Sequence, residues 1–145
     1  MFTIRRATPA DAARASLLLE ELGYKQPVDF FRERLEIFGV QPDELVLVAE
    51  QDGAVVGLLA FRAFLYFHEP GKQGRIIALV VSESVRSSGI GRTLVAEAEK
   101  YAVQCGCKRM EVTTGTQREK AHRFYESMGY QETSKRYLKP LQLAH

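Results

Sequence analysis

The sequence contains no tryptophan, only two cysteines and no long hydrophobic run. Its longest uninterrupted apolar stretch, Ile76–Val81, is far shorter than the ~18 residues of a membrane span. The N-terminal stretch Met1–Arg6 lacks the apolar core of a signal peptide. We therefore expect a cytoplasmic protein with no membrane partner.

The cysteines and histidines do not show the spacing of a metal site. Cys105 and Cys107 have no further cysteine to complete a tetrahedral site, and His68, His122 and His145 show no ligand spacing. A cytoplasmic location also disfavours a disulfide. We expect neither a metal site nor a disulfide.

Charge and length restrict the class of protein further. The sequence has 20 Lys and Arg residues and 18 Asp and Glu residues, which gives a formal net charge of +2. No run of basic residues stands out either, so we expect no nucleic-acid partner. With 145 residues, 46% hydrophobic and 26% charged, the composition is that of a globular protein. We expect one domain, residues 1–145.

The N-terminal part predicts one strand followed by two helices. Phe2–Ala7 has the pattern of a strand, and Thr8 with Pro9 is a typical helix start. The first helix is expected to run to Leu22. A second helix should follow Pro27 and end at Gly39.

The rest of the chain predicts strands followed by alternating helices and strands. We expect a hairpin of Leu45–Gln51 and Ala54–Phe64 around an Asp52-Gly53 turn, a loop over Phe67–Gly74, and a central strand over Arg75–Val81 buried on both faces. The order β-α-α-β-β-β-α-β-α-β predicts an α+β fold with a mixed, mostly antiparallel sheet flanked by helices. Its last four elements are expected over Ile90–Gln104 (helix), Lys108–Thr114 (strand), Gln117–Met128 (helix) and Tyr130–Leu138 (strand).

One loop carries the pattern of an anion site. After the central strand, Arg86-x-x-Gly89-x-Gly91 opens a helix. Unpaired N–H groups and the positive end of the dipole at a helix N-terminus attract phosphate, and glycines let it approach the backbone. The plainer alternative is a glycine-rich turn that only starts a helix. Neither the dinucleotide fingerprint nor the P-loop pattern is present.

A second segment, Phe124-Tyr125-Glu126 followed by Gly129-Tyr130, closes the last helix. Together with Arg86–Gly91 and the element order, it resembles the GNAT superfamily of N-acetyltransferases. The resemblance implies direct transfer of an acetyl group from acetyl-CoA to an acceptor amine. It assigns cofactor contacts to Leu79, Val80, Val81, Arg86, Ser87, Ser88, Gly89, Ile90, Gly91, Arg92, Thr93 and Arg118.

The resemblance also implies that Tyr125 protonates the departing thiolate, and a phenol with a pKa near 10 is a suitable donor. The alternative is a core aromatic, since Ala121, Phe124 and Met128 share its helix face. The sequence departs from the family at Arg118, where many members have Asn. It also departs from the family at Ile77 and Ala78, where many members have a carboxylate that serves as the general base.

The acceptor amine is not named by the sequence. The family's usual substrate lining falls on Tyr24, Phe30, His68 and Glu69, and each of these is also an ordinary loop or core residue. The alternative function is a catalytically silent acetyl-CoA-binding regulatory or sensor module, and a scaffold-like subunit is a weaker third. A homodimer is the oligomer we consider.

Overall fold

The computed structural model describes residues 1–86, 88–113, 119–133 and 136–143. They belong to two compact units, Met1–Thr113 and Thr114–His145. The first unit contains a five-stranded sheet, and the second contains helix α4. Along the chain the elements are β1 (Thr3–Arg6), the short 3-10 turn η1 (Pro9–Asp11), α1 (Ala12–Glu21), α2 (Val28–Val40), β2 (Glu44–Gln51), β3 (Ala54–Leu65), β4 (Lys72–Val81), the 3-10 turn η2 (Glu83–Val85), α3 (Ile90–Gln104), β5 (Cys107–Val112) and α4 (Glu119–Ser127).

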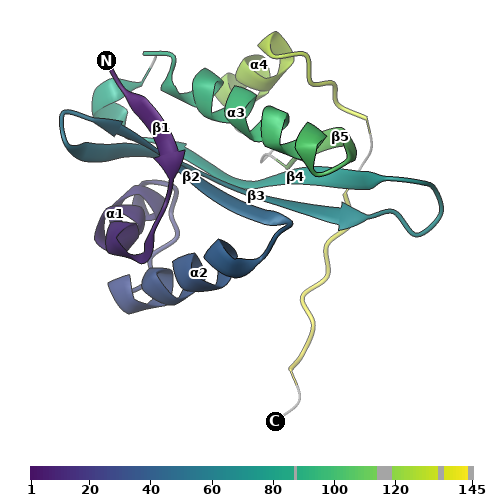
Figure 1. Cartoon of the computed structure of the whole chain (residues 1–145), viewed down its shortest axis with the longest axis horizontal. Helices are drawn as coiled ribbons and strands as arrows, with labels where there is room; N and C mark the ends of the chain where they lie inside the picture. The colour runs from purple at the N-terminus through teal and green to yellow at the C-terminus, as the bar shows by residue number, and fades with distance from the viewer. Residues whose placement is uncertain (87, 114–118, 134–135, 144–145) are drawn as a thin grey trace. The chain divides into compact units, whose positions relative to one another are not determined.

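The sheet has the order β1-β2-β3-β4-β5 (Figure 1). The first four strands pair antiparallel with their neighbours, whereas β4 and β5 pair parallel through the connection that contains α3. This confirms the predicted α+β class with a mixed, mostly antiparallel sheet.

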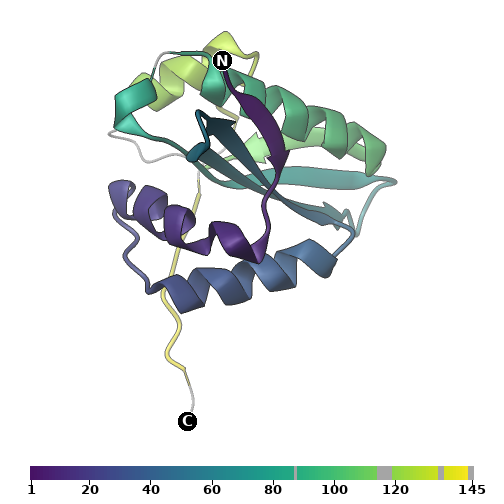
Figure 2. The same ribbon diagram turned by 60° about the vertical axis from the view of Figure 1, so that its left-hand side comes forward.

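Helices cover both faces of the sheet in the first unit. Figures 1 and 2 show α1 and α2 on one face and α3 on the other. On the α3 side Gly57 lets the helix approach β3, because a Cβ there would lie 3.0 Å from Ile90 and 3.2 Å from Leu94. The buried cluster on the α1 side consists of Ala15, Leu18, Leu19, Val48, Val55, Leu58 and Val80.

Two short sequence patterns are found where they were expected, one at a hairpin turn and one at a helix start. Asp52 and Gly53 both have positive φ, 53° and 79°, as a tight hairpin turn requires. At the first helix start, the Asp11 carboxylate accepts the Thr8 N–H at 2.8 Å and two hydrogen bonds from the Arg5 guanidinium at 2.9 Å. This carboxylate therefore ties β1 to the start of α1.

Three expectations were wrong. The loop predicted over Phe67–Gly74 is shorter, because cross-strand pairing with β3 already begins at Lys72. The strand buried on both faces is not continuous, because Ile77 is 43% exposed. The strand predicted over Tyr130–Leu138 is absent from the described residues of that segment. A strand forms only where its backbone hydrogen-bonds to a neighbouring strand, and a single segment of sequence does not show whether such a neighbour exists.

Candidate functional site

Strand β4 has a free backbone edge near its C-terminal end. β3 pairs with it as far as Val81, whereas β5 pairs only with Lys72–Ile76. The β3 register jumps from Ala78 to Ile76, so Ile77 is an extra residue, a β-bulge. A bulge bends its strand and interrupts the ladder. Within the described residues, no strand pairs with the second edge of 77–81.

Of the three β4 residues that the family resemblance assigned to the cofactor, Leu79 and Val81 lie on this free edge, and the Val81 carbonyl already accepts a hydrogen bond from Arg86 Nε. The backbone groups of Val80 face β3, because Ser82, two residues later, donates its N–H to the Val56 carbonyl of β3. Unpaired N–H and C=O groups on a strand edge can bind an extended amide-containing ligand as a further strand. Pantetheine carries two amides of this kind.

The chain leaves the sheet at Ser82, passes through η2 and turns into α3 at Gly89. Gly89 has φ +89° and ψ 0°, a left-handed conformation that favours glycine. Its carbonyl accepts hydrogen bonds from the N–H of Thr93 at 3.0 Å and from its hydroxyl at 2.9 Å. Apart from its chain neighbours, no residue that the structure describes has an atom within 4 Å of a Cβ built on Gly89, so open space adjoins the helix start.

The Arg86 side chain is held beside this turn by one hydrogen bond to the backbone and by two nearby carboxylates. Its Nε donates to the Val81 carbonyl at 3.2 Å, which leaves the two terminal nitrogens directed to other groups. Nη1 lies 3.6 Å from Glu83 Oε1 and Nη2 lies 3.8 Å from Glu21 Oε1. About half of the side chain is exposed, so its charge is accessible to an anion.

The remaining loop residues differ in what they offer. Ser88 is exposed and donates its hydroxyl to the Val85 carbonyl at 2.5 Å, whereas Ile90 is buried and anchors the helix. Arg92 is exposed in the first turn of α3. First-turn N–H groups such as that of Gly91 have no acceptor within the helix. The predicted contacts Ser87 and Arg118 lie outside the described residues.

In the second unit, the Phe-Tyr-Glu…Gly-Tyr motif forms the end of α4. Gly129 has φ +93°, and its N–H donates to the Glu126 carbonyl at 3.0 Å. The Tyr130 N–H reaches back to the Tyr125 carbonyl at 3.0 Å, which completes a Schellman-type helix end. The rings of Phe124 and Tyr130 lie edge-on to Tyr125, with centroids 5.1 and 5.7 Å away.

Tyr125 is only 9% exposed, and burial raises the pKa of its phenol to about 12. The group is therefore protonated throughout the neutral range, as a proton donor must be. Burial agrees equally with the alternative role of a core aromatic.

The four predicted substrate residues are not brought together. Tyr24 is 62% exposed after α1, and Phe30 is half-buried in α2 beneath the Arg34 guanidinium. His68 and Glu69 occupy the β3–β4 hairpin, at the opposite end of β4 from Val81 (Figure 1).

In that hairpin, Glu69 is bound by Arg109 and lies 3.6 Å from His68 Nε2. Arg109 also lies over the Tyr66 ring, 4.9 Å from its centroid. The Glu69 carboxylate is thus already paired with a cation.

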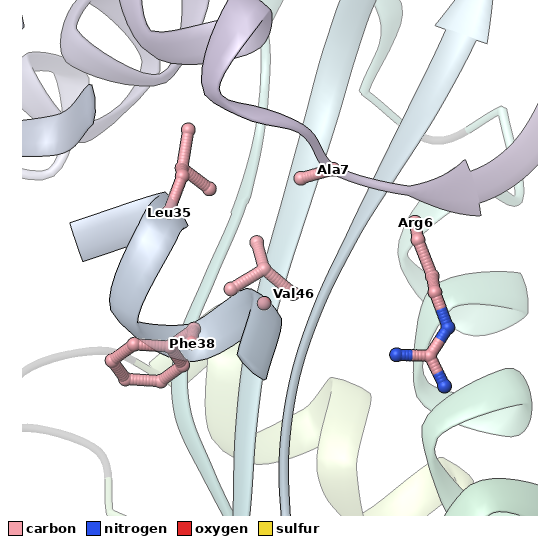
Figure 3. Close-up of a pocket in the computed structure, with 6 residues that line it drawn as sticks. Arg6, Ala7, Leu35, Phe38 and Val46 are labelled. Atoms are coloured by element: carbon pink, nitrogen blue, oxygen red, sulfur yellow. The ribbon is translucent and has the colours of Figure 1, made fainter. Parts of the chain in front are cut away.

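A small cavity and a larger, open cleft lie among the residues that the structure describes. The small cavity, about 80 Å³, lies between β1, α2 and β2; Figure 3 shows Leu35, Phe38 and Val46 together, while the Arg6 side chain extends away from them. Its small size disfavours the binding of an acceptor or a cofactor there. The larger cleft, about 640 Å³, is lined by Arg14, Leu17, Glu20, Glu21, Ser82 and Ser84.

We call this larger cleft the α1–β4 cleft. It is open, and it joins the end of α1 to the first residues after β4. Arg14 is fixed on one side, since its Nε and Nη2 both donate to the Val55 carbonyl at 3.1 and 2.9 Å. Two carboxylates therefore share the cleft with one guanidinium that is already hydrogen-bonded.

Sequence reasoning missed the bulge at Ile77 and the α1–β4 cleft. The bulge had no signal, because Ile77 continues an apolar run. The α1–β4 cleft did have a signal in the sequence, because Glu20 and Glu21 occupy the last turn of a helix. The helix dipole disfavours negative charge there, so a positively charged partner for these carboxylates was to be expected.

Metal binding and membrane insertion find no support in the part of the chain that the structure describes. No three His, Cys, Asp or Glu side chains there are grouped to hold a metal ion, and Cys105 and Cys107 are free thiols. No helix among those residues has the length and apolar character needed to cross a membrane.

Comparison with known proteins adds to this geometry. Residues 13–130 match the model of the acetyltransferase (GNAT) family. The aminoalkylphosphonate N-acetyltransferase of Salmonella typhimurium is 33% identical over 140 residues, covering 95% of this chain and 90% of the relative.

Solved structures share the fold at low identity. A protein described as a transcriptional regulator from Bacillus halodurans superposes with a TM-score of 0.87 at 24% identity, over 97% of this chain and all of the other. An aminoglycoside N-acetyltransferase in complex with CoA superposes with a TM-score of 0.86 at 16% identity, over 99% and 96%. The sequence matches, together with this shared fold, show that the chain belongs to the acetyltransferase (GNAT) family and is an N-acetyltransferase.

Proposed function

We propose that this N-acetyltransferase takes its acetyl group from acetyl-CoA and transfers it directly to a small primary amine, with Tyr125 as the general acid. The observation that carries the proposal is the free β4 edge that leads into the Gly89 turn. One end of this track suits the amides of pantetheine, and the other end suits a pyrophosphate.

The phosphate end combines two sources of positive potential with an open approach. Arg86 supplies a half-exposed guanidinium, α3 supplies its unpaired first-turn N–H groups, and Gly89 leaves the approach open. The 15-residue length of α3 gives a full helix dipole behind the turn.

In the transfer step, the neutral amine nitrogen attacks the thioester carbon, and the carbon–sulfur bond then breaks. The departing thiolate takes the phenolic proton of Tyr125, and the proton lost by the amine restores the phenol through water. A pKa of about 12 keeps Tyr125 protonated until that moment.

We assign the first deprotonation of the amine to water. Ile77 and Ala78 carry no ionisable group, and Glu69 is already paired with Arg109. The hairpin with His68 also lies beyond the first residue of β4, and five residue steps at about 3.3 Å put that end roughly 17 Å from Ile77, where the free edge begins.

The relatives suggest where to look for the acceptor. One is named an aminoalkylphosphonate N-acetyltransferase and another, from Stenotrophomonas maltophilia, an aminoglycoside N(6')-acetyltransferase. We therefore propose a small-molecule primary amine, and aminoalkylphosphonates, aminoglycosides and diamines form the first assay panel.

Tyr125→Phe tests the catalytic assignment, because it keeps the ring and removes only the hydroxyl. As a general acid, Tyr125 predicts a fall in kcat of about 10²–10⁴ with CoA affinity nearly unchanged. The measurement is thiol release with the best amine of the panel, alongside CoA titration of both proteins.

Two outcomes would contradict the proposal. Activity of Tyr125→Phe within a few-fold of the parent would return Tyr125 to a packing role. CoA binding without thiol release, for every amine tested, would instead favour a silent sensor module. The single-domain organisation, the cytoplasmic location and the homodimer stay predictions.

A further inference from the structure

Two arginines lie directly opposite each other on β3 and β4. The strand register pairs Arg62 with Arg75, so both side chains leave the same face of the sheet. The neighbouring Gly74 faces α3, because a Cβ there would contact Phe61, whose ring packs against Tyr101 of α3. Since successive side chains alternate along a strand, the two arginines leave the opposite face, the one on which α1 and α2 lie (Figure 2).

The arginine pair is open to solvent. On the same face α1 packs over Leu58 and Val80, which form another row across β3 and β4. Arg62, four residues further along β3, is exposed, and the Arg75 side chain is 39% exposed. A small ligand can therefore reach both guanidinium groups.

The charges around the pair leave one guanidinium without a partner. Arg75 Nε lies 3.3 Å from Glu111 Oε1, and Arg75 Nη2 donates to Thr113 Oγ1 at 3.4 Å. Arg62 forms no hydrogen bond or ion pair with the residues that the structure describes, although Glu44 lies opposite it on β2. Like charges directly opposite each other on neighbouring strands are destabilising. An anion bound between the two guanidinium groups would remove this repulsion.

The contact with Thr113 places the Arg75 guanidinium at the start of the free β4 edge. Val112, the residue before Thr113, pairs with Ile76, and this is the last pair that the register of β4 and β5 contains. The two strands separate beyond it, and the free edge begins at Ile77. Ile77 is two residue steps, roughly 7 Å, from Arg75 along β4.

This end of the free edge is where the proposed reaction would take place. A pyrophosphate at the Gly89 turn puts the pantetheine arm alongside Val81 first, so the arm runs from Val81 toward Ile77. The thioester, at the far end of that arm, then lies beside Ile77. An amine that attacks it there has the rest of its own molecule close to the arginine pair.

We propose that Arg62 and Arg75 bind an anionic group of the acceptor, and that the favoured acceptor is a small primary amine with a phosphonate or phosphate group two or three carbons from its nitrogen. This inference rests on the proposed function and names its acceptor class. Guanidinium groups bind phosphoryl oxygens through paired hydrogen bonds, and a doubly charged anion balances two of them, whereas a carboxylate balances one. The short spacer follows from the small separation of Arg75 and Ile77 along β4.

The first test compares three acceptors of the same chain length at matched ionic strength. 2-Aminoethylphosphonate carries the dianion, β-alanine carries a carboxylate in its place, and propylamine carries neither. Thiol release from acetyl-CoA gives kcat/KM for each. We expect the phosphonate to exceed propylamine by about ten-fold or more, with β-alanine between them. Equal values for the phosphonate and propylamine would overturn the proposal, and equal values for the phosphonate and β-alanine would overturn the dianion class.

Arg62→Gln tests the site itself. It removes one of the two cations without breaking a contact, so Tm should stay the same or rise. The preference for the phosphonate over propylamine should fall by about five-fold or more. An unchanged preference would overturn the site.

Lys100→Gln is the matched control. It removes the same charge from α3, on the other face of the sheet, where Lys100 Nζ lies 3.2 Å from Glu97 Oε1. It should change the preference by less than about two-fold, since exposed ion pairs contribute little. An equal loss of preference in Lys100→Gln and Arg62→Gln would indicate a general effect of net charge and would also overturn the site.

A binding measurement separates this proposal from the proposed function. Thermal-shift titration with 2-aminoethylphosphonate is made in saturating coenzyme A, so that the other proposed anion site, at Arg86, is occupied. We expect a rise in Tm that is weaker in Arg62→Gln and retained in Lys100→Gln; no rise in the parent would overturn the site. The expected shifts without turnover of any amine would refute the proposed function and leave the arginine site standing. Turnover of the phosphonate and propylamine alike would refute only the arginine site.

Discussion

Replacing Gly89 with alanine tests the phosphate end of the proposed cofactor track. Gly89 has φ +89°, and a Cβ built on it meets no atom within 4 Å. The cost to folding is therefore backbone strain without a steric clash, about 1–2 kcal/mol for an L-residue in the left-handed region. For a chain of 145 residues we expect Tm to fall by about 3–7 °C.

Gly106 provides a matched control. It has φ +88° and likewise no atom within 4 Å of a built Cβ, so Gly106→Ala should carry the same strain. It lies just beyond the other end of α3, whose 15 residues span about 22 Å. The two variants should lose nearly equal stability in thermal unfolding without ligand.

They should differ in cofactor binding. The new methyl group in Gly89→Ala occupies the open space through which a pyrophosphate would approach the helix start, so we expect the Kd for coenzyme A to rise at least ten-fold. Gly106→Ala should change it less than two-fold. If calorimetry gives equal Kd values for the two variants, the Gly89 turn is not the phosphate site. If Tm falls by unequal amounts, the strain argument is wrong.

Two further predictions concern pH. The Arg5 guanidinium holds the pKa of Asp11 below its ordinary value of about 4; the stability it adds is present above that value and is lost as pH falls, so Asp11→Asn should cost about 1–3 kcal/mol at pH 7 and progressively less in acid, as urea unfolding at several pH values will show. If water deprotonates the acceptor, His68→Ala and Glu69→Gln should leave both the rate and the rising limb of kcat/KM against pH unchanged; a shifted limb in either variant would place the base in the hairpin.

The limits of sequence reasoning appear clearly along β4. Its existence followed from the apolar run. The same run predicted a central strand, but in the observed order β4 is the fourth of five strands and β3 is the central one. The bulge at Ile77 could not be predicted from the sequence. A bulge is an extra residue in one strand relative to its partner, so it depends on both strands together and is not visible in the sequence of either one. The same mismatch exposes Ile77 at the point where pairing with β5 stops.

The final strand failed for a related reason. The segment after Gly129 contains residues that favour strands, such as Tyr130, Thr133 and Tyr137. Strand formation nevertheless requires a second segment to pair with. The end of α4, by contrast, could be predicted, because it depends only on residues close together in the sequence. The N–H groups of Gly129 and Tyr130 close the helix through hydrogen bonds to carbonyls within its last turn.

By itself the sequence determined the α+β class, the bounds of α3 from Ile90 to Gln104, and the two motifs that show the family. These depend on periodicity, helix ends and turn residues, all of which act over a few neighbouring positions. Only the tertiary structure decided that Glu21 meets a loop more than 60 residues away, because such a contact depends on how α1 packs against the sheet. The link between cleft and loop is therefore a product of packing, which the local pattern of Glu20 and Glu21 suggests but does not specify.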